Sequence, residues 1–533
     1  MVKLLLWTDC YRSVHNNYAV CCALQKGHNV VVVRLLQEDG SRVKLDTLIH
    51  HKTNQGTMSN KFWKSFSIIL HVLFDEIGNQ QKMFMESNKY SDDVELVNMI
   101  IENTEIDPST NNNYAIRWAS ENGHIAVVNR LLQDSRVNPS DENNYAIRFA
   151  SHNGHIAVVD RLLQEDRSKN RVDPSADNNQ AIRGASRNGH IAIVDRLLQE
   201  DRSKNRVDPS ANNNSAICAA SHYGHIAVVD RLLQDSRVDP SDDNNLAIRW
   251  ASHNGHIAVV DRLLQEDRSK NRVDPSAVNY AICVASRNGH IAVVERLLQD
   301  IRVDPSDDNN YAIRMASHNG HIAVVNRLLQ DGTGRVDPSA NNNYAIRVAS
   351  QFGHIAVVER LLQEDMTKIH VDPSADNNYA IRFASHNGHI AVVNRLLQDG
   401  RVDPSADNNA AIRLASEIGQ IAVVERLLQD ETGRVDPSAD NNYAIRMASR
   451  NGHITVVNRL LQDSRVDPSA DNNYAIRSAS ENGHIAVVER LLQDIRVDPS
   501  ADNNDTIRWA SRNGHIVVVE TLTKGQVKSG KTK

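Results

Sequence analysis

The sequence predicts an all-α fold, a solenoid of stacked helix pairs, and two observations lead to this prediction. A segment of about thirty residues recurs along the chain, and the copy from Val466 to Asp494 reads VDPSADNNYAIRSASENGHIAVVERLLQD. All 13 prolines occupy the same place in the repeat, from Pro108 to Pro499, and each precedes a serine. The repeat also contains a glycine that recurs every 31 to 35 residues, at Gly123, Gly154, Gly189, Gly224, Gly255, Gly289, Gly320, Gly353, Gly388, Gly419, Gly452, Gly483 and Gly514.

The first half of the copy predicts a short helix. Asn472 and Asn473 are suited to a helix N-cap, where a side-chain oxygen accepts an unpaired backbone N–H. Residues Tyr474 to Asn482 then form about two turns, with apolar residues along one side. Gly483 supplies the left-handed residue that ends a helix. A second helix follows, with apolar residues at Ile485, Val487, Val488, Leu491 and Leu492.

The segment around Pro468 is polar and joins each second helix to the next first helix, because proline ends either one. Three copies carry an insertion after the second helix, and we expect it to be a loop: Arg167 to Asn170, Arg202 to Asn205 and Arg268 to Asn271. Two such short helices cannot bury their apolar faces alone. Only stacking against neighbouring copies makes a core.

This unit resembles the ankyrin repeat, whose pattern is T-P-L-H-x-A-A-x-x-G-H-x-x-V-V-x-x-L-L. Residues Tyr474 to Ser480 occupy the first segment, and Gly483-His484, Val487-Val488 and Leu491-Leu492 match the rest. Tyr-Ala replaces Thr-Pro and Arg477 replaces the histidine, so the family's hydrogen bonds from that histidine to the loop are not implied. The sequence of the DPSADNN loop is similar to that of ankyrin arrays from large DNA viruses that infect amoebae.

The copies divide the chain into four parts. Residues 1–37 contain a partial repeat and a first degenerate repeat, and residues 38–110 contain degenerate repeats with an insertion or, alternatively, a small separate domain. Residues 111–520 are thirteen regular repeats. Residues 521–533 form a basic tail that we expect to be disordered.

Composition argues for a reduced, intracellular protein, in the host cytoplasm if the chain is viral. The net charge is −6, from 60 basic and 66 acidic residues, so no global field favours nucleic acid. The early apolar run from Leu4 to Trp7 is too short for a signal peptide or a membrane span. Five cysteines show no paired spacing, and Cys218 and Cys283 stand two copies apart, beyond disulfide reach.

No residue pattern predicts catalysis, a cofactor or a metal site. The segment Gly525 to Thr532 matches the GxxxxGK[ST] phosphate-binding formula, but a helix precedes it where a strand is needed. Twelve of the 23 histidines follow the repeat's glycine, and Gln420 takes the thirteenth place. Successive copies lie about 10 Å apart, too far to share a zinc ion, so we expect these histidines to satisfy the turn.

The inserted segments carry basic triplets, as at Arg167, Lys169 and Arg171. These triplets suit an anionic partner. A solvated loop is the competing interpretation, because Glu165 and Asp166 leave little net charge.

Positions that differ between copies indicate where a partner binds. The residue after the repeat's arginine varies but is mostly apolar, which favours packing between repeats. The residue two before the glycine varies and is polar, and we call this position the variable row. In ankyrin proteins the matching position lines the concave groove. Three copies also place an apolar residue, in place of asparagine, directly before the glycine. The predicted partner-binding residues are therefore Glu121, His152, Arg187, His222, Tyr223, His253, Arg287, His318, Gln351, Phe352, His386, Glu417, Ile418, Arg450, Glu481 and Arg512.

The sequence thus predicts a non-enzymatic scaffold that binds another protein, a host protein if the chain is viral, through its concave face. The alternative is a structural component of a larger assembly such as a virion. Neither nucleic acid nor a membrane is an expected partner.

Overall fold

The computed structural model describes residues 108–528, apart from 165–170, 205–206, 271–274, 332–334, 364–370 and 431–432. Within these ranges the chain forms 26 helices, α8 to α33, and no strand, which confirms the predicted all-α solenoid. No helix in the described ranges is long and apolar enough to cross a bilayer. The predictions for residues 1–107 and 529–533 lie outside the described part of the chain.

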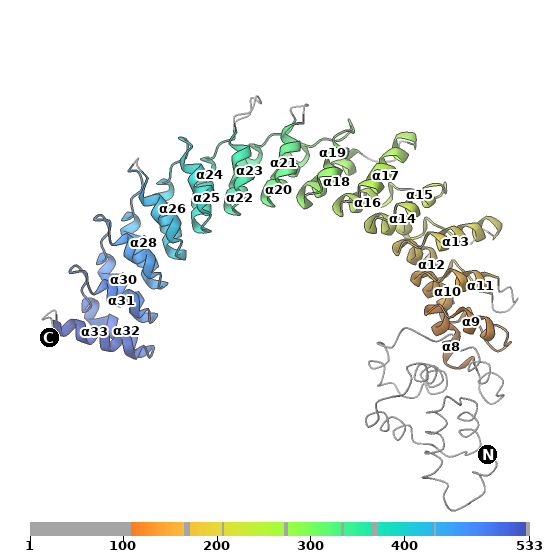
Figure 1. Cartoon of the computed structure of the whole chain (residues 1–533), viewed down its shortest axis with the longest axis horizontal. Helices are drawn as coiled ribbons and strands as arrows, with labels where there is room; N and C mark the ends of the chain where they lie inside the picture. The colour runs from red at the N-terminus through yellow and green to blue at the C-terminus, as the bar shows by residue number, and fades with distance from the viewer. Residues whose placement is uncertain are drawn as a thin grey trace, which may run out of the picture. The chain divides into compact units, whose positions relative to one another are not determined.

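The chain divides into two units between Asp243 and Asn244, and the helix pairs of each unit stand side by side (Figure 1). The first unit contains the helix pairs α8 (Thr110–Glu121) and α9 (Ile125–Leu131), α10 (Asp141–Asn153) and α11 (Ile156–Leu163), α12 (Ala176–Arg187) and α13 (Ile191–Lys204), and α14 (Ala211–Tyr223) and α15 (Ile226–Leu233).

The second unit continues the same alternation of a first and a second helix. The pairs are α16 (Asp242–His253), which begins at the division, and α17 (Ile257–Lys270), α18 (Pro275–Asn288) and α19 (Ile291–Leu297), α20 (Asp307–His318) and α21 (Ile322–Leu329), α22 (Ala340–Gln351) and α23 (Ile355–Leu361), α24 (Ala375–His386) and α25 (Ile390–Leu397), α26 (Ala406–Ile418) and α27 (Ile421–Leu428), α28 (Ala439–Arg450) and α29 (Ile454–Leu460), α30 (Ala470–Glu481) and α31 (Ile485–Leu491), and α32 (Ala501–Arg512) and α33 (Ile516–Lys528).

Most first helices begin with a left-handed turn, which the sequence did not predict. In α30, Asp471, Asn472 and Asn473 have φ angles of 56°, 55° and 59°. Aspartate and asparagine tolerate this conformation better than other L-residues. The right-handed helix therefore starts at Tyr474, as predicted. Asn473 does not act as the predicted side-chain cap, because its Oδ1 accepts a hydrogen bond from the N–H of Asp498 in the next repeat at 2.7 Å.

The core consists of small residues from the first helices and branched residues from the second helices. In the repeat of α30 and α31, Ala475, Ile476 and Ala479 are fully buried, and so are Val488 and Leu491. The alanines allow neighbouring first helices such as α28 and α30 to pack closely. Full burial of each Ile, Val or Leu side chain contributes roughly 1.5–3 kcal/mol, so the stacking of repeats supplies the stability that one repeat lacks.

In two of the three insertions the described residues are helical, contrary to the prediction of loops, and the third, Arg167 to Asn170, lies outside the described residues. Helix α13 continues to Lys204 and α17 continues to Lys270, where shorter copies end near the Leu-Leu pair. The added residues contain no proline or glycine and include good helix formers, so a helix already started can extend. At the other end of the array, α33 runs to Lys528 and includes Gly525 to Lys528 of the phosphate-loop formula.

Candidate interaction surface

The variable row lies at the C-terminal ends of the first helices. Most first helices bury their Ala, Ile, Ala and Ser, and the repeat's arginine and the variable-row residue are half-buried or exposed. The residue after the arginine is buried in some copies, as at Val348 and Met447. The arginine and the variable-row residue are four positions apart and therefore share one face of the helix. We call this surface the first-helix face. All sixteen predicted partner-binding residues have half-buried or exposed side chains.

The backbone beneath the variable row is fixed by the next repeat. The carbonyl oxygen of Glu417 accepts a hydrogen bond from Asn451 Nδ2 at 2.8 Å and another from His453 Nε2 at 3.0 Å. The same pair of bonds recurs from Asn319 and His321 to Arg287. The carbonyls at the end of a helix have no partner within that helix. The histidine is therefore structural, as predicted, but it satisfies the preceding repeat and not its own turn.

The histidine ring also explains why the preceding repeat has a glycine at the end of its first helix. Gly419 has a φ of +86°, and a Cβ placed on it would lie 2.6 Å from His453 Nδ1. Glycine is required here both for its left-handed conformation and for the close approach of the ring. Gly-His is therefore a contact between repeats.

Three members of the variable row accept a hydrogen bond from the tyrosine hydroxyl of the following repeat. The Tyr145 hydroxyl donates to Glu121 Oε2 at 2.9 Å, and the Tyr443 hydroxyl donates to Glu417 at the same distance. Tyr379 donates to Gln351 Oε1 at 2.8 Å. Burial and then the hydrogen bond to Glu121 raise the pKa of Tyr145 to about 12, so this tyrosine stays protonated at neutral pH.

The repeat's arginine connects many of the first helices to the next one. The Arg446 guanidinium lies 5.9 Å from the ring centroid of Tyr443 in its own repeat and 5.3 Å from that of Tyr474 in the following repeat. It also donates to the carboxylate of Asp471 at 2.5 Å and to the carbonyl of Asp440 at 3.3 Å. We call these contacts the arginine ladder, and the same ion pair occurs at Arg148–Asp177, Arg347–Asp376, Arg382–Asp407, Arg413–Asp440 and Arg477–Asp502.

A model of the ankyrin-repeat family, which describes three consecutive copies, matches five stretches of this chain. They are residues 84–173, 182–274, 281–373, 346–441 and 445–531, and together they include most of the sequence. The chain belongs to the ankyrin-repeat family. No curated protein matches the sequence.

In this ankyrin-repeat protein, arginine makes the hydrogen bond to the loop that the sequence did not imply. The family's histidine is replaced by arginine, so hydrogen bonding from that position to the loop was not implied. Arg446 nevertheless bonds to its own loop through the carbonyl of Asp440, and it pairs with Asp471 in the next repeat. A guanidinium has five donors and can make both contacts at once.

The three apolar residues that replace asparagine are about half exposed, and two of them contact the preceding repeat. Tyr223, Phe352 and Ile418 are 44%, 45% and 44% exposed. The Tyr223 hydroxyl accepts a hydrogen bond from Arg187 at 3.0 Å, and the Phe352 ring centroid lies 4.5 Å from that of His318. Two of these residues therefore contact the variable row itself.

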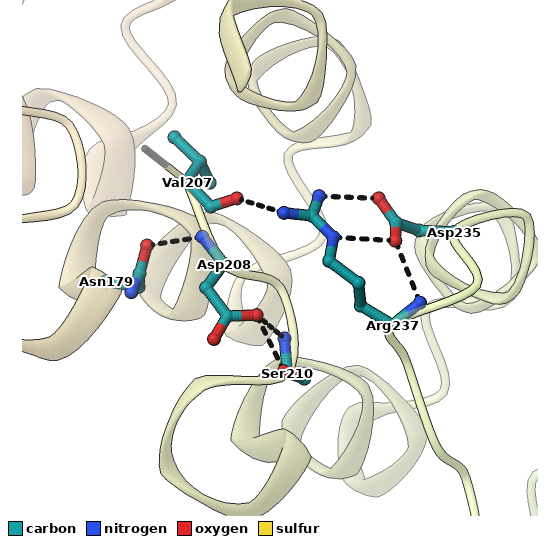
Figure 2. Close-up of polar contacts among 6 residues, drawn as sticks. All are labelled: Asn179, Val207, Asp208, Ser210, Asp235 and Arg237. Atoms are coloured by element: carbon teal, nitrogen blue, oxygen red, sulfur yellow. Dashed lines mark hydrogen bonds and ion pairs between the residues drawn. The ribbon is translucent and has the colours of Figure 1, made fainter. Parts of the chain in front are cut away.

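The loop between repeats is held by a second set of bonds, shown in Figure 2. The buried Asn179 accepts a hydrogen bond from the backbone N–H of Asp208 at 2.8 Å, and the Asp208 carboxylate accepts from Ser210 N–H and Oγ. Arg237 donates to the carbonyl of Val207 at 3.0 Å and pairs with Asp235. Asparagine at this place thus binds the next repeat's loop, although the sequence suggested a helix cap.

These loop ion pairs make stability depend on acidity. The hydrogen bond from the arginine two residues later lowers the pKa of Asp463, and the same holds for Asp494. A carboxyl group whose pKa falls on folding stabilises the folded state at pH values above its unfolded pKa of about 3.9. This stabilisation is lost as the pH drops through the lower pKa of the folded state. We expect the urea midpoint to fall between pH 5 and pH 3, and to fall less in the Arg465→Gln/Arg496→Gln double variant.

The control for this experiment is Arg450→Gln, which removes an exposed arginine of the variable row. Its fall in midpoint between pH 5 and pH 3 should equal that of the unmodified chain. The ion pairs do not contribute to the acid response if the double variant and the unmodified chain lose the same amount.

Proposed function

We propose that this ankyrin-repeat protein is a non-enzymatic scaffold that binds another protein through its first-helix face, which corresponds to the concave face of the family. Ankyrin repeats generally mediate protein–protein interaction. The observation that carries the proposal is the contrast within this face. Its backbone is held by Asn and His bonds from the next repeat, while the side chains of the variable row differ from copy to copy and reach solvent. A rigid surface loses little entropy on binding.

The alternative proposal is a structural role, in which the array packs into a larger assembly such as a virion. The likeness of the DPSADNN loop to ankyrin arrays of large DNA viruses supports a viral origin, and a host protein would then be the partner. In that case the host cytoplasm would be the compartment.

Site-specific photocrosslinking in cells tests the proposal. A photoreactive residue at Phe352, on the first-helix face, should crosslink to another protein. The matched control is Ala356, which is exposed on α23 of the same repeat. Equal crosslinking from both positions would contradict the proposal. A Phe352 product that consists of particle proteins would favour the structural role.

The half-exposed apolar residues provide a second test. We expect Phe352→Asn and Ile418→Asn to leave the melting temperature nearly unchanged, because the new asparagine can donate to the preceding helix end as Asn451 does. Affinity for the crosslinked partner should fall, by roughly 2 kcal/mol for an interface hot spot. Calorimetric melting and titration measure the two quantities. If both variants melt markedly lower and still bind, these residues serve packing.

A further inference from the structure

The arginine ladder lacks its ion pair at Arg249, in the second unit. Arg249 of α16 occupies the ladder position, and its guanidinium lies 4.3 Å from the ring centroid of Tyr280 in α18. In the copies that have the ion pair, the ladder arginine pairs with an aspartate in the left-handed turn of the next repeat. Among the residues that the structure describes, no carboxylate pairs with Arg249.

The missing carboxylate follows from the sequence of the next repeat. That repeat is one residue shorter, and Val278-Asn279 stand where the common copies have Asp-Asn-Asn. Asn279 keeps its structural bond, because its Oδ1 accepts from the N–H of Asp304 at 2.7 Å. The deletion therefore removes the anion that the ladder needs and keeps the hydrogen bond between Asn279 and the loop of the next repeat.

The same repeat also uncovers an aromatic ring. Cys283 replaces the arginine that would lie over the second face of Tyr280, as Arg347 lies over Tyr344 in its own repeat. Tyr280 is 49% exposed, whereas the ladder tyrosines at 311 and 344 are half-buried. Burial raises the pKa of the Cys283 thiol to about 12, so Cys283 adds no charge to this surface.

The same two helices carry further aromatic and basic side chains. Trp250 is 37% exposed, so the packing predicted for this position leaves part of its ring at the surface, and it meets His253 edge-on with ring centroids 5.6 Å apart. His253 and Arg287 are exposed variable-row residues of adjacent repeats. Helix α18 contains no acidic residue. The charges of Asp307 and Asp308, in the turn of the next repeat, act on Cys283.

Other ladder arginines without an aspartate do not form such a site. Arg314 lies between two tyrosine rings and donates to the carbonyl of Asp308 at 2.9 Å. Arg183 faces a repeat that has Asn212 in place of aspartate and Ser215 in place of tyrosine, so no ring stacks on it there. The combination of an arginine lacking its carboxylate with two exposed aromatic rings thus distinguishes α16 and α18 from these copies.

We propose that α16 and α18 form the anchor site for an acidic segment of a partner protein, with a carboxylate bound to Arg249 and an apolar side chain against Tyr280 and Trp250. The site lies on the first-helix face, and this inference rests on the proposed function. Within the chain itself the same position is filled by aspartate, which fits the planar guanidinium through paired hydrogen bonds. Exposed Trp, Tyr and Arg side chains grouped together are typical of interface hot spots. The basic neighbours His253 and Arg287 favour an acidic sequence around the anchoring carboxylate.

The test uses the full-length chain and random 12-residue peptides displayed on phage. Selected peptides should contain Asp or Glu next to an apolar residue. Arg249→Gln should weaken their binding about tenfold or more, because a hydrogen-bonded charge pair is lost. Arg382→Gln is the matched control, since Arg382 is already paired with Asp407, and it should leave binding unchanged.

A second variant fills the site from within the chain. Val278→Asp with one asparagine inserted after it restores the common turn, and its aspartate should pair with Arg249 as Asp376 pairs with Arg347. We expect this variant to fold with unchanged or higher stability and to lose peptide binding. Retained binding in this variant or in Arg249→Gln would overturn the proposal, as would selection of peptides without carboxylates or no selection at all. Tighter binding of a 20-nucleotide single-stranded DNA than of any peptide would also overturn it.

The two proposals fail separately. Crosslinking from Phe352 with no effect of Arg249→Gln on partner binding would leave the scaffold function in place and remove only this anchor site. Crosslinking to no protein from Phe352 would count against the scaffold itself.

Discussion

Replacing Gly320 with alanine should destabilise the array by about 2–4 kcal/mol. Its φ of +76° costs an L-residue roughly 1–2 kcal/mol. A Cβ would also lie 2.5 Å from His354 Nδ1, so the ring must move and weaken its 2.9 Å hydrogen bond to the carbonyl of His318. Loss of that bond adds roughly 0.5–1.5 kcal/mol, and the displaced ring adds a packing cost. Urea denaturation, with hydrogen exchange of peptides from α20 to α23, measures the effect.

Two glycines of the loops separate these costs. Gly433 has a φ of +66° but nothing within 4 Å of an added Cβ, so Gly433→Ala should show the conformational cost alone. Gly400 has open space and no left-handed φ, so Gly400→Ala should be nearly neutral. If Gly320→Ala costs no more than Gly433→Ala, the ring of His354 is not what makes glycine necessary.

Replacing Asn442 with alanine should cost about 1–3 kcal/mol more than replacing its neighbour Asn441. Both residues are left-handed, with φ of 61° and 54°, so the change in backbone preference is matched. Only Asn442 is buried, and its Oδ1 accepts from the N–H of Asp467 at 2.7 Å. Alanine at this place leaves a backbone donor without its partner, and an unsatisfied buried donor costs its desolvation free energy.

Chemical denaturation of the two variants under the same conditions measures this difference. Hydrogen exchange at the N–H of Asp467 gives a local readout, and its protection should fall in Asn442→Ala alone. Equal losses in the two variants would show that the left-handed turn requires asparagine only for its backbone conformation.

Recurrence made the fold predictable from the sequence. A helix pair with apolar residues at Ile476, Val487, Val488 and Leu491 cannot bury them alone, so stacking was the remaining solution, and the structure confirms it. The end of the first helix at Gly483 followed from the left-handed preference of glycine, and its φ is 77°. The insertions were misread because helix extension to Lys204 and Lys270 depends on a helix already anchored by its neighbours.

The candidate surface was predictable in position, because the variable row changes between copies, and its role in partner binding stays a prediction. Its internal partners were not predictable. The bond of Tyr443 to Glu417 joins residues 26 positions apart, and only the geometry of stacking brings the two side chains together. The interruption at Arg249 was visible in the sequence as a missing residue near Val278. Its meaning required knowing that the ladder pairs an arginine with the following repeat.

The sequence by itself determined the helix pairs, their order and the residues that face the core, because helical periodicity and the glycine turn act over a few residues. The tertiary structure alone decided which repeat each polar side chain serves. His453, Asn451 and Arg446 all bond to an adjacent copy, and in a chain of near-identical repeats the same residue types stand at equal spacing on both sides. Only the stacking distance and the direction of each side chain select the partner, and neither is encoded within a single repeat.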